Sequence, residues 1–133
     1  MSPTQLTLKH LRTLGYHAAV VERWNMYAHI RQDLYGYIDI LGVHPARPGV
    51  LGVQCTTGDH AAARIAKAKG NAAMMAWILA GNPLVVHGWV MRKHRNADGS
   101  WSKRGTWELR EIPLTREHLA ETVGEMGCQS AMK

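Results

Sequence analysis

Two short apolar segments of the chain each carry one polar residue that could hold a metal ion. Asp39 lies in residues 37–43 and Gln54 lies in residues 50–57. Both segments are rich in Val, Ile and Leu, which predicts short buried strands. A carboxylate on a buried strand is costly unless it is paired or binds a cation. The pair suggests metal-assisted hydrolysis, with Asp39 as a strong oxygen ligand and the Gln54 amide oxygen as a weaker, neutral one.

A site with a single carboxylate would bind its ion weakly, so a further acid is expected close to Asp39. Glu22, on a predicted strand, and Asp33, in the loop before the Asp39 segment, are the candidates. Phosphate chemistry also needs a nearby cation, and Lys67 on a predicted helix is the candidate. The expected catalytic residues are Asp39, Gln54, Lys67 and Glu22, and the expected metal ligands are Asp39, Gln54 and Asp33.

The chain carries 16 Lys and Arg against 10 Asp and Glu, a formal charge of +6 that fits a polyanion such as DNA. The densest group of cations lies in a predicted hairpin whose turn is residues 96–99, and a Trp lies among them. Lys and Arg contact phosphates, and Trp stacks on bases. Arg64 lies three residues before Lys67, on the same helix face. The residues expected to contact nucleic acid are Arg64, Lys67, Arg92, Lys93, Arg95, Trp101, Lys103 and Arg104.

Each of these residues also has a purely structural interpretation. Asp39 could accept hydrogen bonds from the backbone or an Arg, and Gln54 could be an ordinary core amide. Glu22 could be a solvated strand residue, and Asp33 could pair with Arg31 or shape its loop. Cations on a helix face or a hairpin tip are often simply solvated. From the residues alone, both interpretations stay open.

The elements expected to position these residues alternate between helix and strand. Apolar spacing and turn residues predict helices over 4–14, 59–80 and 116–126, and strands over 17–24, 37–43, 50–56, 84–91 and 106–112. A loop is expected over 25–36 and a sharp turn over 44–49. Three strands, a crossover helix and two further strands predict an α/β fold with a mixed central sheet flanked by helices.

Length and composition favour one soluble domain. The 133 residues suffice for a single core, and 46% apolar with 20% charged residues is ordinary for a globular protein. We expect one domain over residues 1–133, with frayed ends at 1–3 and 127–133. Cys55 and Cys128 show no CxxC spacing, which fits a reducing, cytoplasmic setting. No apolar stretch reaches the length of a membrane span, so no membrane partner is expected.

The order of elements and the two strand motifs resemble the PD-(D/E)XK nuclease superfamily, which includes many restriction enzymes and Holliday-junction resolvases. In that superfamily an Asp opens the second core strand and a Glu-x-Lys triplet lies on the third. Asp39 matches the first motif, and Gln54-Cys55-Thr56 falls where the triplet is expected. The resemblance implies a restriction-endonuclease-like αβββαβ core over roughly residues 4–113.

The same resemblance implies a metal-dependent endonuclease that hydrolyses DNA with Mg²⁺ or Mn²⁺, and it is compatible with a homodimer. The chain departs from the pattern, because Gln54 replaces the second acid and Thr56 replaces the lysine. Some branches of the superfamily use Gln or move the lysine onto the following helix, which would make Lys67 the replacement. Others have lost catalysis. The alternative is therefore an inactive nuclease-like module that binds DNA or a protein partner.

Overall fold

Helix α1 (Pro3–Thr13) begins the fold, and the residues around it supply both of its ends. Ser2 Oγ accepts a hydrogen bond from Gln5 N–H, and Gln5 Oε1 accepts one from Ser2 N–H, which forms a capping box. Gly15, with φ of 93°, follows the last turn. The helix begins at Pro3, within one residue of the predicted start.

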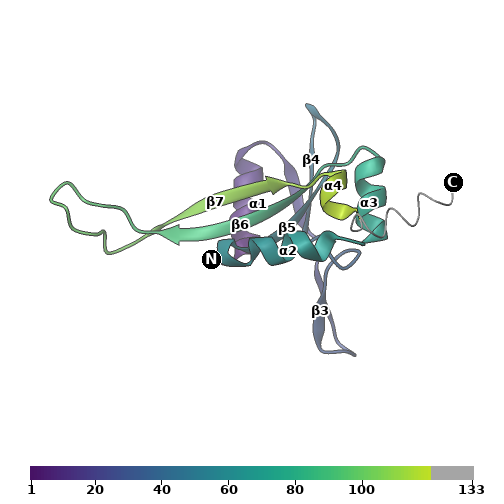
Figure 1. Ribbon diagram of the computed structural model, residues 1–133, viewed down its shortest axis with the longest axis horizontal. Helices are drawn as coiled ribbons and strands as arrows, with labels where there is room; N and C mark the ends of the chain where they lie inside the picture. The colour runs from purple at the N-terminus through teal and green to yellow at the C-terminus, as the bar shows by residue number, and fades with distance from the viewer. Residues whose placement is uncertain (121–133) are drawn as a thin grey trace.

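Five strands form one mixed sheet in the order β1-β4-β5-β6-β7 (Figure 1). The computed structural model describes residues 1–120, so the expected frayed end at 127–133 and Cys128 lie outside the described residues. β5 and β6 run parallel, and every other neighbouring pair is antiparallel. A parallel pair needs a crossover connection, which the helices between β5 and β6 provide. The strands are β1 (His17–Val20), β4 (Ile40–His44), β5 (Arg47–Thr57), β6 (Leu84–Arg92) and β7 (Thr106–Pro113).

Helices lie against both faces of this sheet (Figure 1). Besides α1, the helical elements are η1 (Gly58–His60), α2 (Ala61–Ala68), α3 (Ala72–Leu79) and α4 (Arg116–Leu119). On one face Leu11 of α1 packs with Val53 of β5. On the other face Ala61 and Ala68 of α2 pack with Val86 of β6. This arrangement confirms the predicted α/β class with a mixed sheet flanked by helices.

The single helix predicted over residues 59–80 is wrong, because this segment breaks into η1, α2 and α3. Gly70 has φ of 78°, a left-handed conformation that interrupts a helix. Its N–H donates to the Leu119 carbonyl at 3.1 Å, and Asn71 Oδ1 caps α3 by accepting from Met74 N–H at 3.1 Å. The adjacent Gly and Asn are the signal in the sequence for this break, since Gly ends helices and Asn begins them.

The last predicted helix, over residues 116–126, begins as expected at the Thr115 cap. It ends at Leu119, because Ala120 is extended with ψ of 149°. The remainder of the prediction lies outside the described residues. Among residues 1–120, no helix is long and apolar enough to cross a lipid bilayer.

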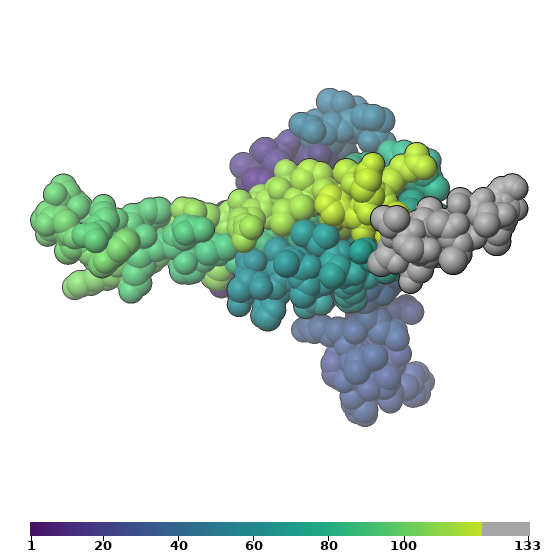
Figure 2. Space-filling view, viewed as in Figure 1, coloured from purple at the N-terminus to yellow at the C-terminus, as the bar shows by residue number. Residues whose placement is uncertain are grey.

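The loop predicted over residues 25–36 is wrong in part, because it contains half of a second β-hairpin. β2 (Arg23–Asn25) pairs antiparallel with β3 (Ile30–Gln32), and this hairpin projects from the sheet (Figures 1 and 2). The strand predicted over residues 17–24 accordingly ends at Val20. The polar residues of the segment favour a loop by propensity, and the pairing of its two halves overrides that preference.

Two strand boundaries near the predicted site also differ from expectation. The strand predicted over residues 37–43 begins only at Ile40, so Asp39 lies immediately before β4. β5 already begins at Arg47, which shortens the turn predicted over residues 44–49 to the residues between β4 and β5. Pairing with β4 therefore extends further toward the turn than its prolines suggest.

A buried polar network joins α1 to the centre of the sheet. Thr7 Oγ1 lies 3.1 Å from His87 Nδ1, and His87 Nε2 lies 2.8 Å from Glu111 Oε2. Trp89 Nε1 donates to Thr7 Oγ1 at 2.9 Å. The hydrogen bond from His87 lowers the pKa of the Glu111 carboxyl, against an opposing effect of desolvation. Thr7 and His87 are both 0% exposed, so their polar atoms depend on these partners.

Replacing Thr7 with Val should lower the free energy of unfolding by about 1–3 kcal/mol, because Trp89 Nε1–H and His87 Nδ1 would lose their partner in the core. Chemical denaturation followed by Trp fluorescence measures the change. The matched control is Thr13→Val at the exposed end of the same helix, where the hydroxyl donates to the Lys9 carbonyl. Equal losses in both variants would contradict this role of the network.

Candidate metal centre

Three carboxylates from separate parts of the chain converge beside the entrance to β4. One oxygen each from Glu22, Asp33 and Asp39 lie within 4.8 Å of one another. Asp39 is 4% exposed, whereas Glu22 and Asp33 are half-buried and reach solvent. Oxygen donors of this kind suit a hard divalent cation such as Mg²⁺ or Mn²⁺.

Hydrogen bonds to the neighbouring backbone fix Asp39 between β1 and β5. The Asp39 N–H donates to the Val53 carbonyl at 2.9 Å, and the Asp39 carbonyl accepts from Val21 N–H at 2.8 Å. The side chain is fixed too, because its Oδ2 accepts from Cys55 N–H at 2.8 Å. One carboxylate oxygen of Asp39 thus accepts a backbone hydrogen bond, as the structural interpretation expects. The same carboxyl group also lies beside Glu22 and Asp33.

The β2–β3 hairpin brings the other two acids together. Glu22 immediately precedes β2 and Asp33 immediately follows β3, and the last paired residues of the hairpin are Arg23 and Gln32. The register of the hairpin therefore makes the two acids neighbours across its base. The expectation that Glu22 lies on the first strand is wrong, because it lies in the connection between β1 and β2.

The environment of the cluster raises the pKa of Asp39 from 3.8 to about 8. Burial is the largest cause, and hydrogen bonding with Asp33 acts in the same direction. The Cys55 N–H lowers this pKa, while the negative charges of Asp33 and Glu22 raise it further. At neutral pH Asp39 therefore keeps a proton, unless a cation takes the proton's place.

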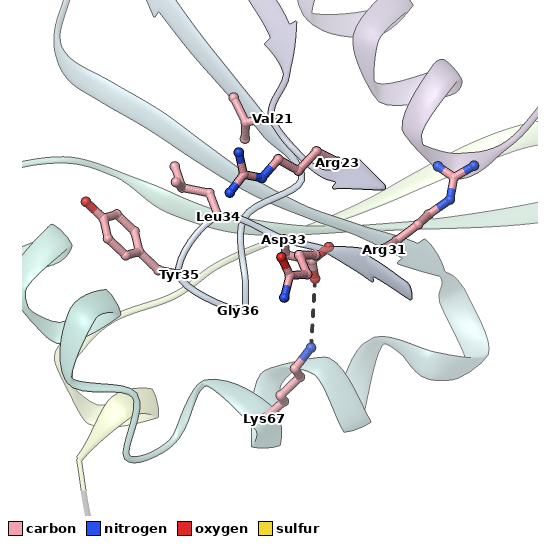
Figure 3. A pocket seen from close by; sticks show the side chains of 9 residues that line it. Val21, Arg23, Arg31, Asp33, Leu34, Tyr35, Gly36 and Lys67 are labelled. Atoms are coloured by element: carbon pink, nitrogen blue, oxygen red, sulfur yellow. Dashed lines mark ion pairs between the residues drawn. The ribbon is translucent and has the colours of Figure 1, made fainter. Parts of the chain in front are cut away.

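A cavity of about 540 Å³ lies next to the cluster, between the base of the hairpin and α2 (Figure 3). Lys67 reaches into it from α2, and its Nζ lies 3.9 Å from Asp33 Oδ2 (Figure 3). Arg23 and Arg31 line the cavity as well. Three cations next to a cluster of carboxylates suit a phosphate that approaches together with a divalent ion.

The two arginines of this cavity were not expected to be functional residues. Arg31 was expected only as a partner of Asp33, and the structure instead pairs its Nη1 with Glu22 Oε1 at 3.3 Å. Asp33 takes Lys67 as its partner. The signal in the sequence is the closeness of Arg23 to Glu22 and of Arg31 to Asp33, which becomes informative only once β2 and β3 are known to pair.

The structure places Gln54 and Thr56 in the interior of β5, with 2% and 5% of their surfaces exposed. Gln54 Nε2 donates to the Tyr37 carbonyl, in the turn that leads into Asp39. This contact agrees with the interpretation of Gln54 as a core amide. It also fixes the turn that leads into Asp39. A role of Gln54 as a metal ligand stays a prediction.

Of the residues predicted to bind nucleic acid, Lys67 is the one brought to the carboxylates. Arg64 lies on the same helix, where its carbonyl accepts from Tyr37 Oη at 2.6 Å and ties α2 to the turn before Asp39. The others lie on the extension of β6 and β7, which projects away from the body of the molecule (Figure 1). These residues are Arg92, Lys93, Arg95, Trp101, Lys103 and Arg104.

No protein-family model, curated protein or solved structure matches this chain. The class of the protein is therefore defined by its own fold and site. It is a mixed α/β protein with a five-stranded mixed sheet flanked by helices, and it carries a carboxylate cluster beside a cavity lined by cations.

The raised pKa of Asp39 predicts that stability without divalent ions falls as the pH rises. The folded protein holds this proton up to about pH 8, whereas the ordinary pKa is 3.8, so folding takes up a proton between these values. The free energy of unfolding should therefore fall across this interval, by up to about 1.4 kcal/mol per pH unit. Urea unfolding in EDTA at pH 5, 6.5 and 8 measures the slope.

The variant Asp39→Asn should remove most of this slope, because the amide stays neutral at every pH and still accepts from Cys55 N–H. Asp98→Asn is the matched control, since Asp98 lies in an exposed turn where its hydrogen bonds with Ser100 lower its pKa. A wild-type protein whose stability is flat from pH 5 to 8, or an Asp39→Asn variant with the wild-type slope, would show that the cluster does not hold this proton.

Proposed function

We propose that the protein is a metal-dependent endonuclease that hydrolyses phosphodiester bonds in DNA. The observation that carries the proposal is the convergence of Glu22, Asp33 and Asp39 within 4.8 Å, with Lys67 Nζ 3.9 Å from Asp33. Hydrolysis of a phosphodiester needs a divalent ion and a cation placed beside the phosphate. The cluster and its cavity offer both kinds of group on one side of the fold.

Glu22, Asp33 and Asp39 would hold Mg²⁺ or Mn²⁺. The fit rests on two observations: all three donors are carboxylate oxygens, and one oxygen of each lies within 4.8 Å of the others. A bound ion would polarise the phosphate and lower the pKa of the attacking water. Within the chain, the Cys55 N–H keeps the Asp39 carboxyl oriented toward the other two acids.

Lys67 takes the place of the lysine that the nuclease pattern puts at Thr56. Thr56 is buried in β5, whereas Lys67 extends from α2 to the edge of the cluster. In the proposed reaction the Lys67 ammonium contacts the phosphate and stabilises the charge that builds up on its oxygens. Arg64 on the same helix and Arg31 at the hairpin base add positive charge for the approach of DNA.

The order of the elements supports a restriction-endonuclease-like αβββαβ core. Helix α1 precedes three antiparallel strands, β1, β4 and β5, and a helical crossover leads to β6, which lies parallel to β5. Asp39 stands at the entrance of the middle strand of the three, and Gln54 lies on the third. The β2–β3 hairpin is then an insertion between the first two strands, and it supplies two of the three acids.

The second candidate function is a nuclease-like module that binds DNA or a protein without cleaving it. The hydrogen bond from Gln54 to the Tyr37 carbonyl favours this alternative, because an ionised Glu at this position has no hydrogen to donate. The β2–β3 hairpin also exposes apolar side chains that suit a binding surface, with Met26 and Tyr27 72% and 98% exposed.

Wild-type protein should cleave plasmid DNA in the presence of Mg²⁺ or Mn²⁺ and should be inactive in EDTA. We expect Asp39→Asn to abolish cleavage and Lys67→Gln to slow it by about 100-fold, the effect typical of losing one group that stabilises transition-state charge. Lys69→Gln, two residues along at the exposed end of the same helix, is the matched control and should stay within about twofold of wild type. Wild-type protein that never nicks DNA with either ion would refute the endonuclease.

A metal-binding experiment separates the endonuclease from the inactive module. At pH 8, Mn²⁺ should raise the unfolding temperature of the wild type, because an ion present at 100 times its Kd stabilises the folded state by about 2.7 kcal/mol. Glu22→Gln, Asp33→Asn and Asp39→Asn should each weaken this shift, since each removes one charged ligand. An unchanged unfolding temperature in Mn²⁺ would favour the module without a metal site.

A further inference from the structure

Between β6 and β7 the chain runs out from the sheet and back again as two adjacent segments, which we call the basic arm, residues 92–106. It projects from the body of the molecule (Figures 1 and 2). Every residue from 91 to 100 is exposed.

Polar contacts within the arm hold its two limbs together. Two backbone hydrogen bonds join the limbs. Asn96 N–H donates to the Ser100 carbonyl at 2.7 Å, and Ser102 N–H donates to the His94 carbonyl at 2.8 Å. Near its base, His94 Nε2 lies 2.6 Å from Thr106 Oγ1. The arm buries no apolar core of its own, and isolated hairpins of this kind are marginally stable. A bound partner would therefore supply contacts that the arm lacks.

The charges of the arm indicate that this partner is a polyanion. Lys93, Lys103 and Arg104 are exposed, and no carboxylate of residues 1–120 lies within 4.0 Å of their nitrogens. Arg92, at the base of the arm, pairs with Glu108 at 2.9 Å. The single acid of the arm, Asp98, is turned toward the Ser100 N–H and hydroxyl at its tip. Three cations thus remain to contact phosphates.

Trp101 has a partner within the arm, which bears on the form of the nucleic acid. The Arg95 guanidinium carbon lies 4.6 Å from the centre of the Trp101 ring, and Arg95 Nη1 donates to the Gly99 carbonyl at 2.7 Å. One ring face is therefore occupied by a cation that stiffens the tip. Single-stranded nucleic acid is bound through aromatic faces that stack on bases, whereas a duplex keeps its bases stacked and presents phosphates along its grooves.

We propose that the basic arm enters the major groove of double-stranded DNA and anchors the duplex through Lys93, Lys103 and Arg104. This inference deepens the proposed function and rests on it for the identity of the nucleic acid. A major groove about 12 Å wide admits two antiparallel chain segments side by side, and the arm is a pair of such segments, joined by the bridge between Arg95 and Trp101. The arm is a separate projection from the carboxylate cluster, so it sets the affinity for the duplex and leaves the chemistry of cleavage to the cluster (Figure 1).

Fluorescence anisotropy in EDTA tests the arm without any cleavage. The probes are a labelled 24-base-pair duplex and one of its strands, titrated with full-length wild type and with the triple variant Lys93→Gln, Lys103→Gln, Arg104→Gln. We expect the wild type to prefer the duplex and the variant to lose about tenfold or more of its duplex affinity. The slope of log affinity against log salt concentration should also fall in magnitude by nearly 3, or about 0.9 for each phosphate that the variant no longer neutralises.

The matched control neutralises three exposed cations of α1 and α4, Lys9, Arg12 and Arg116, and should lose much less duplex affinity than the arm variant. Equal loss in both variants, wild-type duplex affinity in the arm variant, or tighter binding of the single strand would each overturn the inference.

A second comparison separates binding by the arm from cleavage at the cluster. Asp39→Asn should bind the duplex at least as well as wild type. Binding through the arm without any cleavage would refute the endonuclease and leave the arm intact, whereas cleavage by the arm variant at saturating DNA would support the separation of the two roles.

Discussion

The confinement of three carboxylates within 4.8 Å is the constraint on which the rest of the site depends. Like charges at this distance oppose folding, so each acid needs a neighbour that offsets its charge. Arg31 pairs with Glu22, Lys67 faces Asp33, and Asp39 retains its proton. The three acids and the two cations come from the hairpin, α2 and the entrance to β4, and the site therefore exists only when all three are in place.

The ion pairs and hydrogen bonds around the three acids do not fully compensate for burying them, and this bears on function. Exposed ion pairs such as those of Arg31 and Lys67 contribute little to stability, since solvent screens them. Asp39 still has a pKa near 8, so burial and the neighbouring acids outweigh its contact with the Cys55 N–H. For a buried aspartate with a purely structural role, we would expect hydrogen bonds to lower the pKa by more than burial raises it. Residues with strongly shifted pKa values collect at functional sites, so the raised pKa of Asp39 makes this cluster the candidate site of the fold.

The parts of this structure that follow from local patterns were predictable, and the parts that follow from pairing were not. The apolar runs that become β5, β6 and β7 stand out in the sequence, as does an aspartate inside such a run. The nearness of Glu22 to Asp33 depends on the register of β2 with β3, two strands of three residues whose polar composition resembles a loop. The break at Gly70, in contrast, has a local signal in Gly70 and Asn71, and the contact of Gly70 with Leu119 adds to it.

A glutamine rather than an acid at position 54 is physically consistent with the rest of the cluster. A glutamate there would add a fourth carboxyl group on the strand next to Asp39, where burial and two acids already disfavour ionisation. Gln54 adds no charge, and its amide holds the turn that presents Asp39. In the proposed endonuclease, the hairpin would supply the acids that β5 lacks, and Lys67 would supply the ammonium that Thr56 lacks. The charges that the proposed phosphate chemistry requires would then come from elements next to β5 instead of from β5 itself.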